Sequence, residues 1–162
     1  MSAWATTMSH PVCHCGGFGE LRAVDLATGQ RLPLGHHESW VNAVATATVE
    51  GRPVAAVAGE DATGRVWDLT TGEALGQPLI GHTAAIRTVS VTTLTSRPVV
   101  ITGGDDCTIR AWDLTTGRQV GPELCFPNPI RAVATTTGGE LIVCHGTEIT
   151  LFAPDRADRT TR

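Results

Sequence analysis

The chain contains no lysine and no tyrosine, and all twelve of its basic residues are arginine. Because lysine codons are rich in A and T, this composition favours a GC-rich bacterial genome as the source. The formal net charge is −4, and no stretch concentrates arginine in the way that binding to a phosphate backbone requires. The composition therefore argues against a nucleic-acid partner.

Long apolar runs are also missing, although 41% of the 162 residues are hydrophobic. No run approaches the length that crosses a bilayer, and the first residues lack the features of a signal peptide. Cys107, Cys125 and Cys144 stand where other parts of the chain carry Ala, Ile or Val, which is typical of small buried hydrophobic residues. We therefore expect no membrane partner and a cytoplasmic, reducing location.

The most regular part of the chain is the stretch 81–114, which opens with Gly-His and ends shortly after Trp-Asp. It holds a run rich in Val and Thr at 86–94, an apolar run at 98–102 and an alternating run at 108–112. Runs this short, rich in β-branched residues and bounded by Gly or Pro, predict β-strands.

The same pattern occurs one unit earlier in the chain. A spacing of 45 residues relates three pairs of residues, which are Trp67 and Trp112, His37 and His82, and Asp61 and Asp106. A fixed period of this size is typical of repeat architecture, in which each repeat is one supersecondary unit.

A Gly-His start, a Trp-Asp end and four strands per unit resemble the WD-repeat (Trp-Asp repeat) family of β-propellers, of bacterial type. The resemblance covers nearly the whole chain and implies an all-β fold of four-stranded antiparallel blades. It divides the chain into a propeller arc at 1–154 and a polar C-terminal tail at 155–162. The arc has four units, the last of them without an outer strand, at about 2–34, 37–80, 82–125 and 129–153.

Four blades leave three alternatives for the ring. The chain is a piece of a longer propeller, or two copies complete an eight-bladed ring, or one copy closes alone as a strained four-bladed ring. The first two alternatives are favoured equally over the third, because propellers of this family resemble seven- or eight-bladed rings more often than four-bladed ones. An isolated arc would expose the apolar flanks of its first and last blades, since one blade cannot bury both faces alone.

The resemblance also assigns a structural hydrogen-bond network to each complete repeat. The network joins the His after Gly, a Ser or Thr of the second strand, the Asp of the following turn and the Trp. The third unit carries all four residues, namely His82, Thr102, Asp106 and Trp112.

The second unit carries only part of this network. His37, Asp61 and Trp67 match, but Val57 stands in place of the hydroxyl residue. We therefore expect this unit to lose one link and some rigidity. His36 competes for the histidine position because it follows Gly35 directly, but His37 keeps the repeat spacing.

Two patterns suggest chemistry, and the sequence favours a simpler interpretation of each. His, Thr and Asp resemble a hydrolase triad, but no nucleophile elbow or oxyanion loop accompanies them, so we expect no catalytic residue and no enzyme activity. His10, Cys13, His14 and Cys15 suggest a metal site. On a strand, however, the two cysteines face away from His14, so we expect no metal and no cofactor.

Two acidic pairs, at 60–61 and 105–106, follow the second strand of their units. The loop spacing of a calcium-binding EF-hand does not surround either pair. We therefore expect them to cap turns rather than to bind a metal ion.

The resemblance implies that protein partners meet the narrow top face of the propeller. The residues that map to this face are Trp40, Asn42, Glu60, Arg87 and Asp105. Trp40 is either an exposed aromatic anchor, a residue type enriched in binding hot spots, or a side chain packed under a loop or neighbouring blade. Arg87, Glu60 and Asp105 form either part of this surface or ordinary solvated charge.

These observations predict a non-catalytic scaffold that presents a rigid top face to a protein partner, which the sequence does not name. The alternative is a structural oligomerisation module or a truncated piece of a larger multi-blade regulatory protein. If the chain is an oligomerisation module, its partner is another copy of the chain, and the resulting homo-oligomer completes the ring. A metal-binding or hydrolytic protein is the third hypothesis.

Overall fold

The computed structural model describes residues 20–25, 27–94, 96–136 and 139–153. Every element in this part of the chain is a β-strand. The strands are β1 (Glu20–Val24), β2 (Arg31–His36), β3 (Val41–Val49), β4 (Arg52–Gly59), β5 (Thr63–Asp68), β6 (Ala74–Ile80), β7 (Ile86–Leu94), β8 (Arg97–Gly104), β9 (Thr108–Asp113), β10 (Leu124–Cys125), β11 (Ile130–Thr135), β12 (Leu141–His145) and β13 (Glu148–Phe152). Within the described ranges, no helix is long and apolar enough to span a bilayer.

The strands form four antiparallel sheets in which neighbours in sequence are neighbours in space. We call β1–β2 the first sheet, β3–β6 the second, β7–β10 the third and β11–β13 the fourth. The second and third sheets are four-stranded meanders, as expected for propeller blades. The first part of the unit expected at 2–34, up to residue 19, lies outside the described residues.

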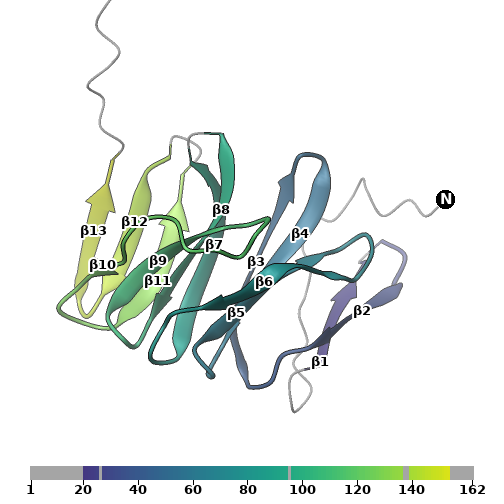
Figure 1. Ribbon diagram of the computed structural model, residues 1–162, viewed down its shortest axis with the longest axis horizontal. Coiled ribbons are helices and arrows are strands. Elements are labelled where there is room, and N and C mark those ends of the chain that lie inside the picture. The colour runs from purple at the N-terminus through teal and green to yellow at the C-terminus, as the bar shows by residue number, and fades with distance from the viewer. Residues whose placement is uncertain (1–19, 26, 95, 137–138, 154–162) are drawn as a thin grey trace, which may run out of the picture.

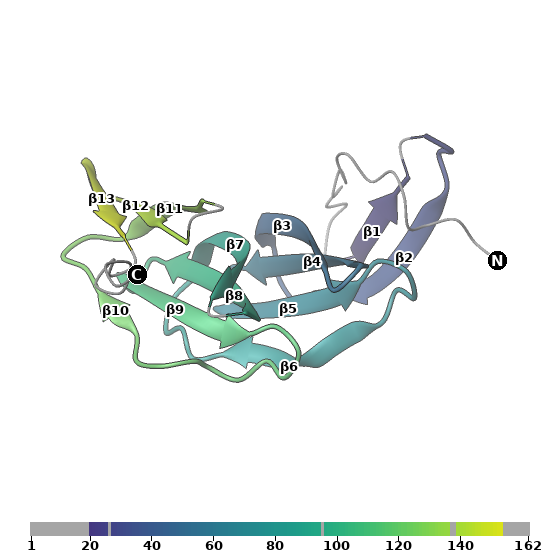
Figure 2. The same cartoon turned by 90° about the horizontal axis from the view of Figure 1, so that it is seen from above.

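The four sheets stand side by side in chain order, from the first sheet at one end to the fourth at the other (Figures 1 and 2). The described strands therefore form an open arc and not a closed ring. The least favoured of the three alternatives, in which one copy closes alone as a strained four-bladed ring, is wrong for this structure.

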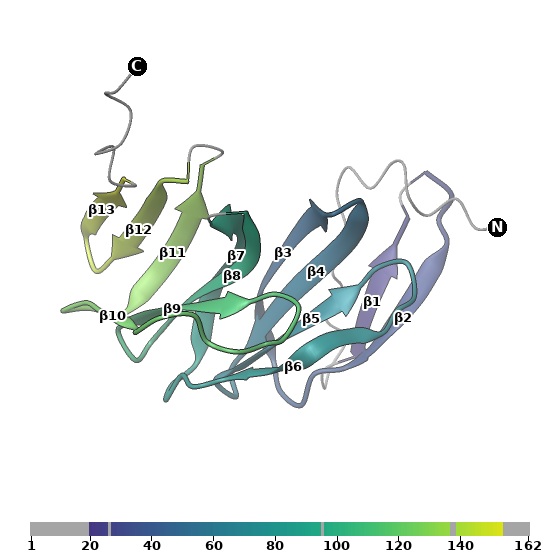
Figure 3. The same ribbon diagram turned by 45° about the horizontal axis from the view of Figure 1, so that its top comes forward.

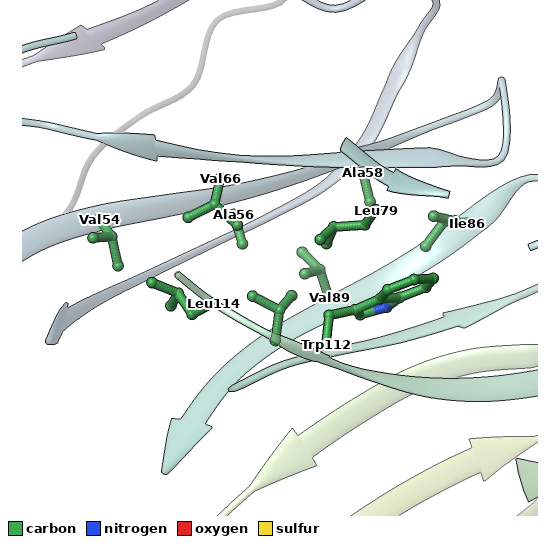
Figure 4. Close-up of a cluster of buried hydrophobic side chains, with 10 residues drawn as sticks. Val54, Ala56, Ala58, Val66, Leu79, Ile86, Val89, Trp112 and Leu114 are labelled. Carbon is green, nitrogen blue, oxygen red and sulfur yellow. The ribbon is translucent and has the colours of Figure 1, made fainter. Parts of the chain in front are cut away.

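The hydrophobic core lies between successive sheets and not in one central place. The largest cluster joins the second and third sheets (Figure 4) and consists of Val54, Ala56, Ala58, Val66, Leu79, Ile86, Val89, Val100, Trp112 and Leu114. A second cluster, which includes Trp67, joins the first and second sheets, and a third joins the third and fourth sheets. Because a middle sheet packs on both sides, residues 54–59 of β4 are all buried, which explains why its sequence is continuously apolar.

Turns define the register of the strands. Glu50 and Gly51 both have positive φ angles, of 50° and 78°, and form the two-residue turn that joins β3 to β4. The outer strand that ends the unit at 82–125 is short, because it consists only of β10 and one bridge between Trp112 and Gln119. Gly121 has a φ of 72° and Pro122 has no N–H group, so the strand ladder is interrupted there.

Candidate functional site

A continuous hydrogen-bond network runs through the interior of the third sheet. His82 Nε2 lies 2.7 Å from the hydroxyl oxygen of Thr102, and the indole N–H of Trp112 donates to the same oxygen at 2.8 Å. His82 Nδ1 lies 2.9 Å from a carboxylate oxygen of Asp106. The His82, Thr102 and Trp112 side chains are buried, and the Asp106 side chain is only 4% exposed.

The chemistry of these groups determines which atom carries each proton. An indole N–H can only donate, so Thr102 accepts a hydrogen bond from Trp112. Burial lowers the pKa of His82 and favours the neutral imidazole. The carboxylate of Asp106 can only accept, so Nδ1 carries the proton and donates to it, and Nε2 accepts from the Thr102 hydroxyl. Every buried polar atom of the network has a partner in this arrangement.

Burial and hydrogen bonding shift the pKa values of both titratable groups downwards. Burial lowers the pKa of His82 from 6.5 by more than the carboxylate of Asp106 raises it. Burial raises the pKa of Asp106, but hydrogen bonds from the Thr83 amide, Thr108 and His82 together lower it from 3.8. The folded state therefore favours a neutral imidazole beside an ionised carboxylate.

The second sheet has the same residue positions, but the hydrogen bonds are missing. Val57 occupies the place of Thr102, and His37 Nε2 and the indole N–H of Trp67 have no partner. His37 Nδ1 lies 3.5 Å from Asp61 without forming a hydrogen bond. His37 is buried, whereas His36 is exposed at the end of β2.

The second residue of each acidic pair caps a turn. Asp61 accepts hydrogen bonds from the amide and hydroxyl groups of Thr63, and Asp106 accepts the equivalent bonds from Thr108. No group of three or more potential metal ligands exists within the described ranges. The candidate ligands His10, Cys13, His14 and Cys15 lie outside those ranges.

The first residue of each acidic pair belongs to a charged network that links neighbouring sheets. Arg87 of β7 donates to Asp105 of its own sheet at 2.6 and 2.8 Å and to Glu60 of the second sheet at 2.9 and 3.3 Å. Asn42 of β3 donates to Glu60 at 2.9 Å and to the backbone carbonyl of Ile86 at 3.0 Å. The hydrogen bond to Asp105 raises the pKa of Arg87, which stays charged.

Arg131 of β11 extends this network to the fourth sheet, which sequence reasoning missed. Its guanidinium lies 3.4 Å from Asp105. Arg131 stands 44 residues after Arg87, which is close to the repeat spacing. This spacing is the feature of the sequence that could have placed Arg131 in the network. We call Asn42, Glu60, Arg87, Asp105 and Arg131 the rim network.

Trp40 is the large aromatic residue next to the rim network. Its backbone carbonyl accepts a hydrogen bond from the amide of Glu60 at 2.9 Å, which fixes the chain just before β3. Trp40 is 65% exposed. Among the described residues, no loop or neighbouring sheet therefore covers it.

We expect the substitution Arg87→Met to have a small, salt-dependent effect on stability. It removes the ion pair with Glu60 that links the second and third sheets, but Glu60 and Asp105 keep access to water, so neither charge is left buried. The melting temperature should fall by no more than a few degrees in low salt. The difference from the wild type should shrink at high ionic strength, because salt screens exposed charges. A large loss that is independent of salt would contradict this interpretation.

Comparison with known protein families decides the assignment. The family model described as "WD domain, G-beta repeat" matches residues 73–113, which include β6 to β9 and the four residues of the complete hydrogen-bond network. Residues 73–113 are a WD repeat. No curated protein matches the chain.

The WD-repeat assignment supports the interpretation of the network as structural, because repeats of this family are typically non-enzymatic.

A shallow groove of about 350 Å³ lies at the ends of the inner strands β3, β7 and β11. It is lined by Thr48, Thr92, Thr93, Thr135, Thr136 and three apolar residues, none of which is charged. These groups supply neither a general base nor an activated nucleophile.

Proposed function

We propose that this WD-repeat protein is a non-catalytic scaffold that binds a protein partner through Trp40 and the adjacent rim network. WD repeats generally mediate protein–protein interactions. The observation that carries the proposal is the position of Trp40, a mostly exposed aromatic side chain next to a polar surface that spans three sheets. Aromatic residues of this kind are enriched in binding hot spots.

The rim network supports a rigid binding surface. Its arginines and carboxylates already pair with one another, so the formal charges of the two acids and two arginines cancel. A partner therefore gains most from contact with the Trp40 ring, whereas the rim supplies orientation and the exclusion of water.

Site-specific photo-cross-linking tests this proposal. A photoreactive amino acid at position 40 should capture a defined partner from an extract of the source cells. The matched control is position 120, where Val120 is also an exposed apolar residue but lies outside the rim. Equal capture from both positions would reject the proposal.

The captured partner then allows a quantitative prediction. The substitution Trp40→Ala should weaken its binding at least tenfold, because truncation of a hot-spot aromatic costs about 2 kcal/mol or more. The control Val120→Ala should change the affinity less than threefold. Both can be measured by isothermal titration calorimetry, and an unchanged affinity for Trp40→Ala would remove Trp40 from the interface.

A second candidate function is an oligomerisation module, favoured by the open arc of the described sheets. In this alternative, blades of another copy or of a longer polypeptide complete a ring. A solution mass of one copy for the purified chain would reject ring completion by two copies, because that ring requires a dimer that joins the fourth sheet of each copy to the first sheet of the other.

A further inference from the structure

The outer side of the fourth sheet is a continuous apolar surface. The strand register places six side chains on this side, which are Ala132, Ala134, Ile142, Cys144, Ile149 and Leu151. Ile149 is 74% exposed and Leu151 is 62% exposed. The sheet lies at one end of the arc, with β13 at its edge (Figure 3). We call these six residues the end face.

The opposite side of the same sheet is already used. Val133, Leu141 and Val143 pack against Ile101 and Ile109 of the third sheet. The end face therefore points away from the described part of the protein. A contiguous apolar surface in this position is a candidate for contact with another molecule.

Equivalent surfaces elsewhere in the chain are covered by a sheet. In the second sheet, the strand register places Ala43, Ala45, Ala56, Ala58, Gly64 and Val66 in the same positions. Most of these residues pack into the cluster shared with the third sheet. The end face is therefore a surface that this fold buries under another β-sheet wherever the described chain continues.

The side chains of the end face do not suit a further sheet seated as the fourth sheet is seated on the third. Cys144 corresponds to Ala58 and Gly103, and a Cβ atom at Gly103 would lie only 2.5 Å from a methyl group of Ile130. A cysteine leaves even less room at this contact. The other end of the arc is also a poor match, because the first sheet exposes Arg31, and the end face has no carboxylate to pair with it.

The end face complements itself. Small residues, Ala132 and Ala134, occupy β11, and large residues, Ile149 and Leu151, occupy β13. A twofold axis parallel to the strands would place β13 of one copy over β11 of the other, so that each large side chain meets a small one. None of the six residues is charged, so two identical surfaces meet without burying a charge.

We propose that the end face is a homodimer interface, in which the fourth sheets of two copies pack face to face about a twofold axis. This arrangement differs from ring completion, which would join unlike ends. It is independent of the proposed role of Trp40, which stays accessible in the dimer because it belongs to the second sheet and the rim.

The size of the end face predicts a weak dimer. Three strands of about five residues cover roughly 240 Å² on each copy. A stable complex buries about 800 Å² on each partner. The expected dissociation constant is therefore on the order of 10–1000 μM, and the monomer dominates in dilute solution.

Sedimentation velocity over a wide range of protein concentration tests the interface. The wild-type mass should rise from one copy to two and then stay constant. The substitution Ile149→Glu should weaken the association at least tenfold. The matched control is Ile80→Glu, since Ile80 is 70% exposed on β6 and lies outside the end face, and this variant should dimerise as the wild type does.

Cross-linking through Cys144 tests the geometry. In a variant with the other four cysteines changed to serine, a short thiol–thiol cross-linker should trap the dimer, because Cys144 lies near the middle of the end face on β12. If the free edges of β13 paired instead, the two copies of β12 would lie three strand spacings apart, about 14 Å. The two Cys144 side chains would then point in parallel directions rather than toward each other.

Four results would overturn the proposal. They are a monomer at every concentration, a mass that rises beyond two copies as in head-to-tail assembly, a dimer that survives Ile149→Glu, and a dimer that Cys144 does not cross-link. A monomer would leave the proposed role of Trp40 untouched, and a failed Trp40 experiment would leave the dimer untouched. The two proposals therefore fail separately.

Discussion

The substitution Thr102→Val should destabilise the protein by about 2–4 kcal/mol. Valine has nearly the same shape as threonine, so the packing between the second and third sheets is preserved. The hydroxyl is the common partner of His82 and Trp112, and its removal leaves two buried polar groups without a hydrogen bond. Each buried group of this kind costs about 1–3 kcal/mol.

The second sheet supplies the matched reverse substitution. Val57→Thr places a hydroxyl where His37 Nε2 and the indole N–H of Trp67 lack partners. It should stabilise the protein by about 1 kcal/mol, the typical net value of a buried hydrogen bond. Urea denaturation followed by tryptophan fluorescence measures both changes. A stability for Thr102→Val equal to that of the wild type would show that the network contributes specificity but little free energy.

The substitution Asp106→Asn should destabilise the protein by about 3 kcal/mol at pH 7. The carboxylate accepts hydrogen bonds from His82, the Thr83 amide and Thr108, and asparagine keeps the shape but loses the charge. The matched control is Asp61→Asn. Its effect should be smaller, because Asp61 forms no hydrogen bond with His37 and its side chain is 24% exposed.

The pH dependence of stability tests the same network. The folded-state pKa of His82 is lowered from 6.5, so the unfolded chain binds its proton first and stability falls as the pH drops below about 6.5. The pKa of Asp106 is lowered from 3.8, so its contribution is complete above that pH and is lost as the pH falls through the folded-state value.

The variant Asp106→Asn should separate these two effects. Compared with the wild type, its loss of stability below pH 4 should shrink, because the titrating carboxylate is gone. Its loss between pH 7 and 5 should persist, because His82 no longer has a carboxylate to raise its pKa. Denaturation midpoints measured across this pH range decide the matter, and parallel curves for the two proteins would contradict it.

The amino-acid sequence determined the family and the local structure. The spacing of 45 residues between His37 and His82 and between Trp67 and Trp112 predicted a WD repeat, and the family match confirms it. The position of β8 followed from the short apolar run at 98–102, which turn residues bound. These features depend on residues close together in the chain, which is why a periodic pattern predicts them.

Some deviations also have local causes that the sequence contains. The outer strand of the third sheet is interrupted at Gly121 and Pro122, where positive φ and a missing N–H end the ladder. The substitution of Val57 for a hydroxyl residue predicted a missing link in the second sheet. The distance of 3.5 Å between His37 and Asp61 shows that a second contact is also too long for a hydrogen bond.

The tertiary structure alone decided how the repeats meet. Arg87 pairs with Glu60 across the second and third sheets, and Arg131 reaches Asp105 from the fourth. The exposure of Trp40, the open arc and the uncovered end face depend on the same arrangement. Repeat spacing specifies which residues occupy equivalent positions within a sheet. The distances between sheets depend on packing between distant parts of the chain, which no local pattern encodes.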